Sequence, residues 1–326
     1  MKLATLRDGS RDGELVVVSR DLRSMLRAGA VAHTLQGALD RWSDAAPRLA
    51  SLYDALNKGK APGIEPFDPR QAMSPLPRAY QWCDGSVFVA HMERMSKWRN
   101  LPVPEDFTKS PYMYQGASDG FLGPMEDVPA VSEEWGIDYE AEVAVVTDAV
   151  SYGCNAREGG QHIALVMLCN DVSLRNLIPP ELAKGFGFVQ SKPASSFSPV
   201  AVTPDELRGA WQDFRLHLPL RSYVNGTLFG DPDAGAMVFG FHELMAHVAK
   251  TRSLTPGSII GSGTVASRDD SRGTSCVIER RVKEILAHGE PRTAFLKFGD
   301  RVRIEMLDAS GASVFGAIDQ KITRVA

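Results

Sequence analysis

Short runs of apolar residues near the start of the chain predict a β-hairpin. The runs 2–6 and 15–18 are separated by the segment 8–13, which is rich in Asp and Gly and is therefore typical of a turn between paired strands. Asp21 then precedes a second apolar cluster, and an acidic residue at such a place is a common helix cap. We therefore expect a short helix directly after the hairpin.

Apolar positions between 33 and 56 recur at helical spacing and predict one or two amphipathic helices, interrupted at Pro47. The segment 61–78 contains five prolines, which restrict their own backbone and that of the preceding residue. Such a segment is typical of a stiff connector between domains. We therefore expect a small N-terminal α/β domain, residues 1–75, and a larger domain, residues 76–326.

The larger domain is expected to be rich in strands. One helix should end near Trp98, and another should interrupt the strands at 241–249. The segments 111–129 and 179–199 are rich in Gly and Pro and predict long irregular loops, which often carry function in compact domains. The expected strands are 139–146, 161–168, 215–224, 227–228, 259–260, 277–278, 295–296, 302–306 and 317–325. This pattern predicts an α+β fold that is mostly β.

Composition argues against several classes of partner. Of 326 residues, 44% are hydrophobic and 23% are charged, as in globular proteins with a substantial core. The formal net charge of −4 and the pI near 6.0 argue against a nucleic acid or an anionic membrane as the partner. No apolar run approaches the roughly 20 residues needed to span a bilayer, and the first eight residues lack the apolar core of a signal peptide. We expect a cytoplasmic protein.

The four cysteines are scattered along the chain and form no CxxC pair. This spacing indicates neither a zinc site nor a disulfide framework. We expect all four to be reduced and buried, since a free Cys behaves as a small hydrophobic residue. They are Cys83, Cys154, Cys169 and Cys276.

Acidic residues alternate with other side chains in Asp138-Tyr139-Glu140-Ala141-Glu142. Alternate side chains of a strand point to the same face, so the three carboxylates would share one face. Stacked carboxylates repel one another, and a divalent cation with oxygen ligands would relieve that repulsion. The alternative is an edge strand with an acidic face exposed to solvent.

Three further residues combine acid and imidazole chemistry. Asp84 and His91 lie seven residues apart and could share one face of a helix, although a lone His in an apolar run is usually a satisfied core residue. Glu279 is a single acid in a predicted apolar strand. Pairing with a neighbouring arginine is its simplest interpretation, so none of the three indicates catalysis by itself.

Basic and small polar residues supply the remaining candidates. Asp171 follows an apolar run, and Arg175 could neutralise it as an i,i+4 pair. Lys192 lies before a proline in a predicted loop, where a lysine is usually solvated. The turn 262–264, Ser-Gly-Thr, follows an apolar run and either presents backbone N–H groups to an anion or is an ordinary turn.

Taken in their order, these motifs resemble those of the fumarylacetoacetate hydrolase family. They are an Asp with a His seven residues on, Glu-x-Glu on a strand, Asn-Asp-x-Ser-x-Arg, a loop Lys, Ser-Gly-Thr and a late Glu. The resemblance covers about residues 80–325 and is strongest at 138–142 and 170–175, with further similarity at 118–124 and 261–264. It implies the mixed β-sandwich or β-roll catalytic domain of that family, preceded by the small N-terminal domain.

The resemblance also implies a divalent cation, Mg²⁺ or alternatively Ca²⁺ or Mn²⁺, held by four carboxylates. The matching positions are Asp84, Glu140, Glu142 and Asp171. Oxygen ligands suit hard cations, which fits the absence of a Cys/His cluster from the sequence. The family pattern leaves Asp138 outside the ligand set.

By the same resemblance, His91 is the general base that activates water, and Glu279 orients and polarises its imidazole. Arg175 and Lys192 match positions that stabilise developing oxyanions, and Thr264 matches one that contacts the substrate carboxylate. The cation would bind the two oxo groups of the substrate as a Lewis acid.

These roles favour hydrolysis of a C–C bond in a β-diketo acid, first of all fumarylacetoacetate to fumarate and acetoacetate in aromatic amino acid catabolism. Alternatives on the same cation site are an acylpyruvate hydrolase, a hydratase of 2-oxo-4-pentenoate-type substrates and an oxaloacetate decarboxylase; a non-catalytic scaffold is a further one. Ser86 stands where the fumarylacetoacetate-cleaving enzymes carry Tyr, and 176–180 lacks their Gln and Tyr. The resemblance also implies a homodimer with a small-molecule substrate.

Overall fold

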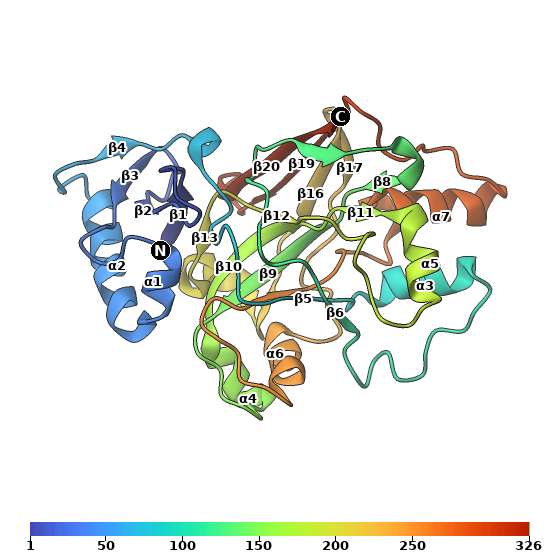
Figure 1. Ribbon diagram of the computed structural model, residues 1–326, viewed down its shortest axis with the longest axis horizontal. Helices are drawn as coiled ribbons and strands as arrows, with labels where there is room; N and C mark the ends of the chain where they lie inside the picture. The colour runs from blue at the N-terminus through green and yellow to red at the C-terminus, as the bar shows by residue number, and fades with distance from the viewer. Residues whose placement is uncertain (326) are drawn as a thin grey trace.

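The computed structural model describes residues 1–325, and it confirms an α+β fold that is mostly β (Figure 1). The large sheet contains, in spatial order, β4 (Glu65–Pro66), β3 (Ser24–Arg27), β2 (Glu14–Val18), β1 (Lys2–Leu6), β13 (Ala201–Val202), β10 (Ile163–Asn170), β9 (Ala141–Thr147), β18 (Ile259–Gly261), β5 (Trp82–Gly85) and β6 (Met113–Gln115), and β12 (Ser196–Phe197) also pairs with β10. A second sheet contains β17 (Thr227–Gly230), β16 (Leu220–Val224), β19 (Arg301–Leu307), β20 (Ser313–Arg324) and β7 (Val128–Ala130).

Two strand pairs stand apart from these sheets, β8 (Ile137–Asp138) with β11 (Ser173–Leu174) and β14 (Trp211–Gln212) with β15 (Arg215–Leu216). The α-helices are α1 (Leu35–Leu39), α2 (Trp42–Asn57), α3 (Val89–Trp98), α4 (Ala156–Gly159), α5 (Ile178–Leu182), α6 (Phe241–Ala249) and α7 (Val277–His288). Short 3-10 turns are η1 (Pro69–Gln71), η2 (Glu133–Trp135), η3 (Gly160–His162), η4 (Arg175–Leu177), η5 (Pro204–Ala210) and η6 (Asp270–Arg272). Within residues 1–325 no helix combines the length and the apolar character that a membrane span requires.

The N-terminal hairpin is confirmed, but two details of the helix predictions there are wrong. Asp21 does not cap a helix: its carboxylate accepts hydrogen bonds from Ser19 and from the amide of Arg23, which closes a turn leading into β3. Pro47 lies inside α2, and the break between the two helices falls earlier, at 40–41. Helix α2 covers β2 and β3 at the blue end of the molecule (Figure 1).

The N-terminal strands belong to the same sheet as the strands of the larger domain. Strand β1 pairs antiparallel with β13, Leu3 opposite Ala201, and β13 pairs with β10 through Val202 and Val166. Backbone hydrogen bonds therefore continue from the first hairpin to the centre of the molecule. The division at residue 75 stays a prediction.

The later strand predictions are mostly confirmed, with one important error. Residues 277–278 are not a strand, because they begin helix α7. The pair at 295–296 forms only an isolated bridge, between Leu296 and Ile137. The predicted loop 111–129 contains strand β6, which pairs with β5, and the predicted loop 179–199 contains β12.

Strand β9 at the centre of the large sheet is buried along its whole length. Val143 and Val145 pack into one hydrophobic cluster and Ala144 and Val146 into another, as alternation across a covered sheet requires. The sheet is therefore covered on both faces, and any polar side chain of β9 lies in the interior.

Candidate active site

Three carboxylates, each from a different segment, meet at the same end of neighbouring strands in the large sheet. Asp84 lies in β5, Glu142 in β9, and Asp171 directly follows β10. They share a face because Asp84, Glu142 and Asp171 each lie two residues from a member of the same hydrophobic cluster. Those members are Trp82, Ala144 and Cys169. Their oxygens lie within 4.8 Å of one another, and all three side chains are buried.

Glycines make room for this cluster. Gly261 of β18 pairs with both flanking strands, and a Cβ there would lie 2.2 Å from Asp84 Oδ1. Gly263 has a φ of +76°, and a Cβ on it would lie 2.2 Å from the carbonyl oxygen of Gly85. Its amide donates to Asp84 Oδ1 at 2.9 Å. The Gly-Ser-Gly turn is therefore shaped by the need to approach Asp84 closely.

The cluster has the electrostatics of a cation site. Burial raises the pKa of Asp84 well above its usual range, and repulsion from Asp171 adds to this. Burial likewise raises the pKa of Glu142. Neither carboxylate oxygen of Glu142 has a hydrogen-bond partner among residues 1–325, which is rare for buried polar atoms. A divalent cation with oxygen ligands fits these residues.

Glu140, the fourth expected ligand, lies beside this cluster but is bound to two cations. Arg175 Nη2 donates to one of its oxygens at 2.7 Å and Lys192 Nζ to the other at 2.6 Å. Burial alone would raise the pKa of Glu140, but the two cations outweigh burial and lower it. Each oxygen keeps a second lone pair, so Glu140 can complete a ligand set only while sharing its oxygens with these side chains.

Lys192 is a buried bridge between the acidic residues rather than a solvated loop lysine. Its ammonium contacts Glu140 and, at 2.5 Å, Asp171 Oδ2. Burial opposes its charge, but these carboxylates raise its pKa. Asp171 also accepts from Tyr114 at 2.6 Å and from Ser195 at 2.7 Å. Tyr114 and Ser195 were not predicted, because both lie in segments expected to be irregular.

Asp138 does not join the face formed by Glu140 and Glu142. Its two oxygens accept the amides of Val277 and Ile278 at 2.7 and 2.9 Å, so that Asp138 caps the N-terminus of α7. All three acidic residues of this stretch are at most 6% exposed. The alternative of a solvent-exposed acidic edge is therefore wrong.

Arg175 connects Asp138 to Glu140. Its Nε donates to Asp138 at 2.8 Å and its Nη2 to Glu140, and these carboxylates raise its pKa despite burial. No ion pair joins it to Asp171 among the described residues. The simpler prediction of an i,i+4 pair is therefore wrong.

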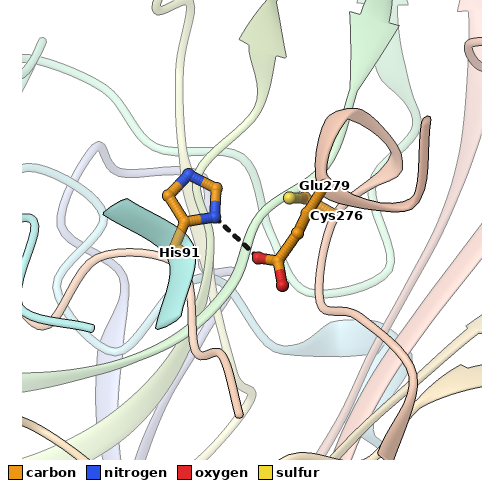
Figure 2. A group of neighbouring side chains, drawn as sticks. All are labelled: His91, Cys276 and Glu279. Atoms are coloured by element: carbon orange, nitrogen blue, oxygen red, sulfur yellow. Dashed lines mark hydrogen bonds and ion pairs between the residues drawn. The ribbon is translucent and has the colours of Figure 1, made fainter. Parts of the chain in front are cut away.

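His91 and Glu279 form a short pair between two packed helices. His91 lies on α3 and Glu279 in the first turn of α7, and His91 Nδ1 lies 2.6 Å from Glu279 Oε2 (Figure 2). A carboxylate on Nδ1 fixes the proton there and leaves the other ring nitrogen as a base. Glu279 is fully buried. The prediction that it lies in a strand is wrong, because it belongs to α7.

Cys276 lies beside this pair, and the three residues offer ligand atoms within 4.8 Å of one another (Figure 2). A second metal is nevertheless disfavoured there, because Glu279 Oε1 already accepts from Arg94 Nη1 at 2.6 Å. Burial also raises the pKa of the Cys276 thiol and keeps it protonated. All four cysteines are free and buried, as predicted.

One cavity of about 450 Å³ opens onto several of these groups. Its polar wall is formed by Asp84, His91, Glu140, Arg175, Lys192 and Thr264. Its apolar wall includes Met92, Met95, Trp98, Met113, Ile178 and Phe188. The cavity therefore brings two carboxylates (Asp84 and Glu140), an imidazole and two buried cations within reach of one small molecule.

In this mixed β fold, Asp84 of a buried carboxylate cluster and His91 of a His–Glu pair line the same cavity, an arrangement that fits an enzyme site. The family follows from the sequence: the model for the fumarylacetoacetate (FAA) hydrolase C-terminal domain matches residues 81–323. The model for fumarylacetoacetase N-terminal domain 2 matches residues 1–78. The chain belongs to the fumarylacetoacetate hydrolase family, as its motifs predict.

Curated relatives match the chain over about half of its length. Human mitochondrial oxaloacetate tautomerase is 26% identical over 185 residues, which are 56% of this chain and 54% of that protein. A mitochondrial oxaloacetate tautomerase from Bos taurus is 27% identical over 186 residues, again 56% and 54%. The chain thus spans about half the length of the curated relatives it matches.

Solved structures share the fold over the whole chain. Fumarylacetoacetate hydrolase from Exiguobacterium antarcticum superposes with a TM-score of 0.70 at 15% identity, covering 100% of both chains. Maleylpyruvate hydrolase from Sphingobium sp. SYK-6 gives a TM-score of 0.67 at 16% identity with the same coverage. At such identities the likeness concerns the fold.

Proposed function

We propose that this protein is a metal-dependent hydrolase that cleaves a C–C bond in a β-diketo acid, with fumarylacetoacetate as the first candidate substrate. The observation that carries the proposal is the His91–Glu279 pair, 2.6 Å apart, with His91 on the same cavity as Asp84 of the carboxylate cluster. Hydrolysis needs a base for water, whereas decarboxylation needs chiefly an electron sink.

The base acts through the nitrogen that Glu279 leaves unbound. Nε2 of His91 removes a proton from water, and the hydroxide adds to the oxo carbon. The C–C bond then breaks, its electron pair remains on the leaving fragment, and the imidazolium returns the proton to that carbon. The buried Glu279 stabilises the imidazolium between these two transfers.

Asp84, Glu142 and Asp171 would hold the cation, with Glu140 as the shared fourth ligand. The unpartnered oxygens of Glu142 support this assignment. A bound Mg²⁺, or Ca²⁺ or Mn²⁺, would supply Lewis-acid stabilisation of negative charge on the oxo groups. A structural neighbour of the chain, a maleylpyruvate hydrolase at 16% identity, is described in complex with manganese(II) and pyruvate.

Other cavity residues would bind and orient the substrate. Arg175 and Lys192 bring fixed positive charge to the side of the cavity where an oxyanion develops. Thr264 follows the glycine that binds Asp84 and lines the cavity, so that its hydroxyl can donate to a substrate carboxylate.

A second candidate is tautomerisation of oxaloacetate, which the names of the curated relatives favour. Proton transfer at a carbon next to an oxo group could use the same base and cation site. The two reactions differ in their products: hydrolysis splits the substrate into two acids, whereas tautomerisation only interconverts the keto and enol forms of one molecule.

The test compares the purified protein with His91→Ala in the presence of Mg²⁺. Fumarylacetoacetate, acylpyruvates and oxaloacetate are assayed side by side, and Mg²⁺ binding is measured by calorimetry for both proteins. We expect wild-type cleavage of a β-diketo acid and a loss of about 10²- to 10⁴-fold in the variant, with Mg²⁺ affinity retained. Full turnover by a variant that still binds Mg²⁺ would exclude His91 as the base.

We also propose a homodimer, in line with the family resemblance. Light scattering of the purified chain tests it directly, and a mass of 35.5 kDa would correspond to a single chain.

A further inference from the structure

Arg94 holds the side of Glu279 that faces away from His91. It lies on α3 three residues after His91, so that successive turns of one helix carry both side chains. Arg94 Nη1 donates to Glu279 Oε1 at 2.6 Å, while His91 contacts Oε2. The other end of the guanidinium donates to Asp270 at 2.9 Å. Arg94 is therefore fixed at both ends.

These contacts decide how Glu279 can behave. Glu279 is fully buried, and a buried carboxylate with one donor keeps freedom to rotate and carries an unpaired charge. With Arg94 on Oε1 and His91 on Oε2, each carboxylate oxygen has a partner and the group is held in one orientation. Arg94 does not line the substrate cavity, so it can influence chemistry only through its neighbours.

We propose that Arg94 is a positioning residue that fixes Glu279 as the partner of His91, an inference that rests on the hydrolytic function proposed above. Helix α3 then carries both the base and the clamp on its orienting acid. The competing interpretation is that Arg94 only ties α3 to the loop at 267–272, since Asp270 lies in that loop.

The chain supplies a matched control for the competing interpretation. Glu93, the residue before Arg94, forms an exposed ion pair with Arg268, 2.6 Å at its shortest. This pair also ties α3 to the 267–272 loop, but it does not contact Glu279. Glu93→Gln therefore removes a comparable tie and leaves the dyad alone.

The first test is a double-substitution cycle of Arg94→Met and Glu279→Gln measured on turnover. Arg94→Met should lower kcat by about tenfold to a hundredfold with little change in KM, because orientation of the base is lost. In the Glu279→Gln background the same change should alter kcat by no more than about twofold. Equal losses in both backgrounds, or an equal loss in Glu93→Gln, would overturn the proposal.

The second test observes the His91–Glu279 pair directly by NMR, without measuring turnover. The protein has seven histidines; with ¹⁵N-labelled imidazoles, the Nδ1–H proton of His91 is identified by its disappearance in His91→Gln. We expect this proton to be protected from exchange in wild type and in Glu93→Gln, and to exchange rapidly in Arg94→Met. An unchanged signal in Arg94→Met would refute the role of Arg94. If the signal responds as expected but no β-diketo acid is cleaved, the proposed function fails and the positioning role stands.

Discussion

Replacing Glu142 by Gln should stabilise the metal-free protein and weaken its binding of Mg²⁺. Glu142 is fully buried, and neither of its oxygens has a hydrogen-bond partner among residues 1–325. Gln keeps the shape, removes the charge and offers an amide N–H₂ that can donate to Asp84 or Asp171. A substitution that stabilises the metal-free form and destabilises the metal-bound form identifies a ligand whose oxygens are unpaired when the cation is absent.

The magnitudes follow from these contacts. An unsatisfied buried group costs roughly 1–3 kcal/mol, more if it is charged, so the metal-free variant should gain about this free energy of unfolding. Losing one of three close carboxylates should weaken Mg²⁺ binding at least about a hundredfold, which at saturating Mg²⁺ removes about 2.7 kcal/mol of stabilisation.

Glu140 provides the control, two residues away. Its oxygens are bound by Arg175 and Lys192, so Glu140→Gln leaves two buried cations short of a counter-charge. Breaking such a buried pair costs about 3–5 kcal/mol. The metal-free Glu140 variant should therefore be less stable than wild type, opposite in sign to the Glu142 variant.

Thermal unfolding in EDTA and in excess Mg²⁺ measures both effects for wild type and the two variants. We expect Tm in EDTA to rise for Glu142→Gln and to fall for Glu140→Gln, and the increase on adding Mg²⁺ to be largely lost for Glu142→Gln. A Glu142 variant that is destabilised in EDTA and keeps the full Mg²⁺-dependent increase would refute Glu142 as a ligand.

The metal-free protein should lose stability as pH rises above about 4, the usual carboxyl pKa. Burial raises the pKa of Asp84 and Glu142, so the native state keeps protons that the unfolded chain has released. Denaturant titrations from pH 5 to 8 should show the free energy of unfolding falling with pH in EDTA and rising with pH in Mg²⁺. Gly263→Ala should lower the free energy of unfolding by roughly 2–4 kcal/mol and weaken Mg²⁺ binding, because the new Cβ would lie 2.2 Å from a backbone oxygen. Gly153→Ala is the control, since Gly153 also has a positive φ but lies in open space, and it should cost only about 1 kcal/mol. Equal losses of stability in the two variants would contradict the close-approach argument. Asp138→Asn should lower the unfolding free energy by about 2–4 kcal/mol and reduce kcat in calorimetric assays of turnover, whereas unchanged kcat would show that the cap of α7 does not matter for the dyad.

Strong local patterns were enough to predict most of the fold. The first hairpin has alternating apolar runs around an Asp- and Gly-rich turn, and the Asn-Gly turn at 225–226 connects two strands as expected. Helix α7 could not be predicted in this way, because its start depends on Asp138, a residue 139 positions away in the chain. Strand β6 is equally dependent on pairing with β5 and carries no pattern of its own.

The candidate site was predicted less by local patterns than by the order of motifs. That order indicated Asp84, Glu142 and Asp171, which the fold brings together. It could not indicate Arg94 or Tyr114, because their roles arise from contacts across helices and strands. A single arginine on a helix face or tyrosine in a loop has no distinguishing signal in one sequence.

The capping of α7 by Asp138 has a consequence for how such a site can change over evolutionary time. One carboxylate holds both the first turn of the helix that carries Glu279 and the guanidinium of Arg175. Substitution at position 138 would therefore disturb the start of the helix that carries Glu279 and the position of Arg175 at the same time. Substitutions in the apolar wall of the cavity are less constrained, because none of those side chains holds two polar segments of the site in place.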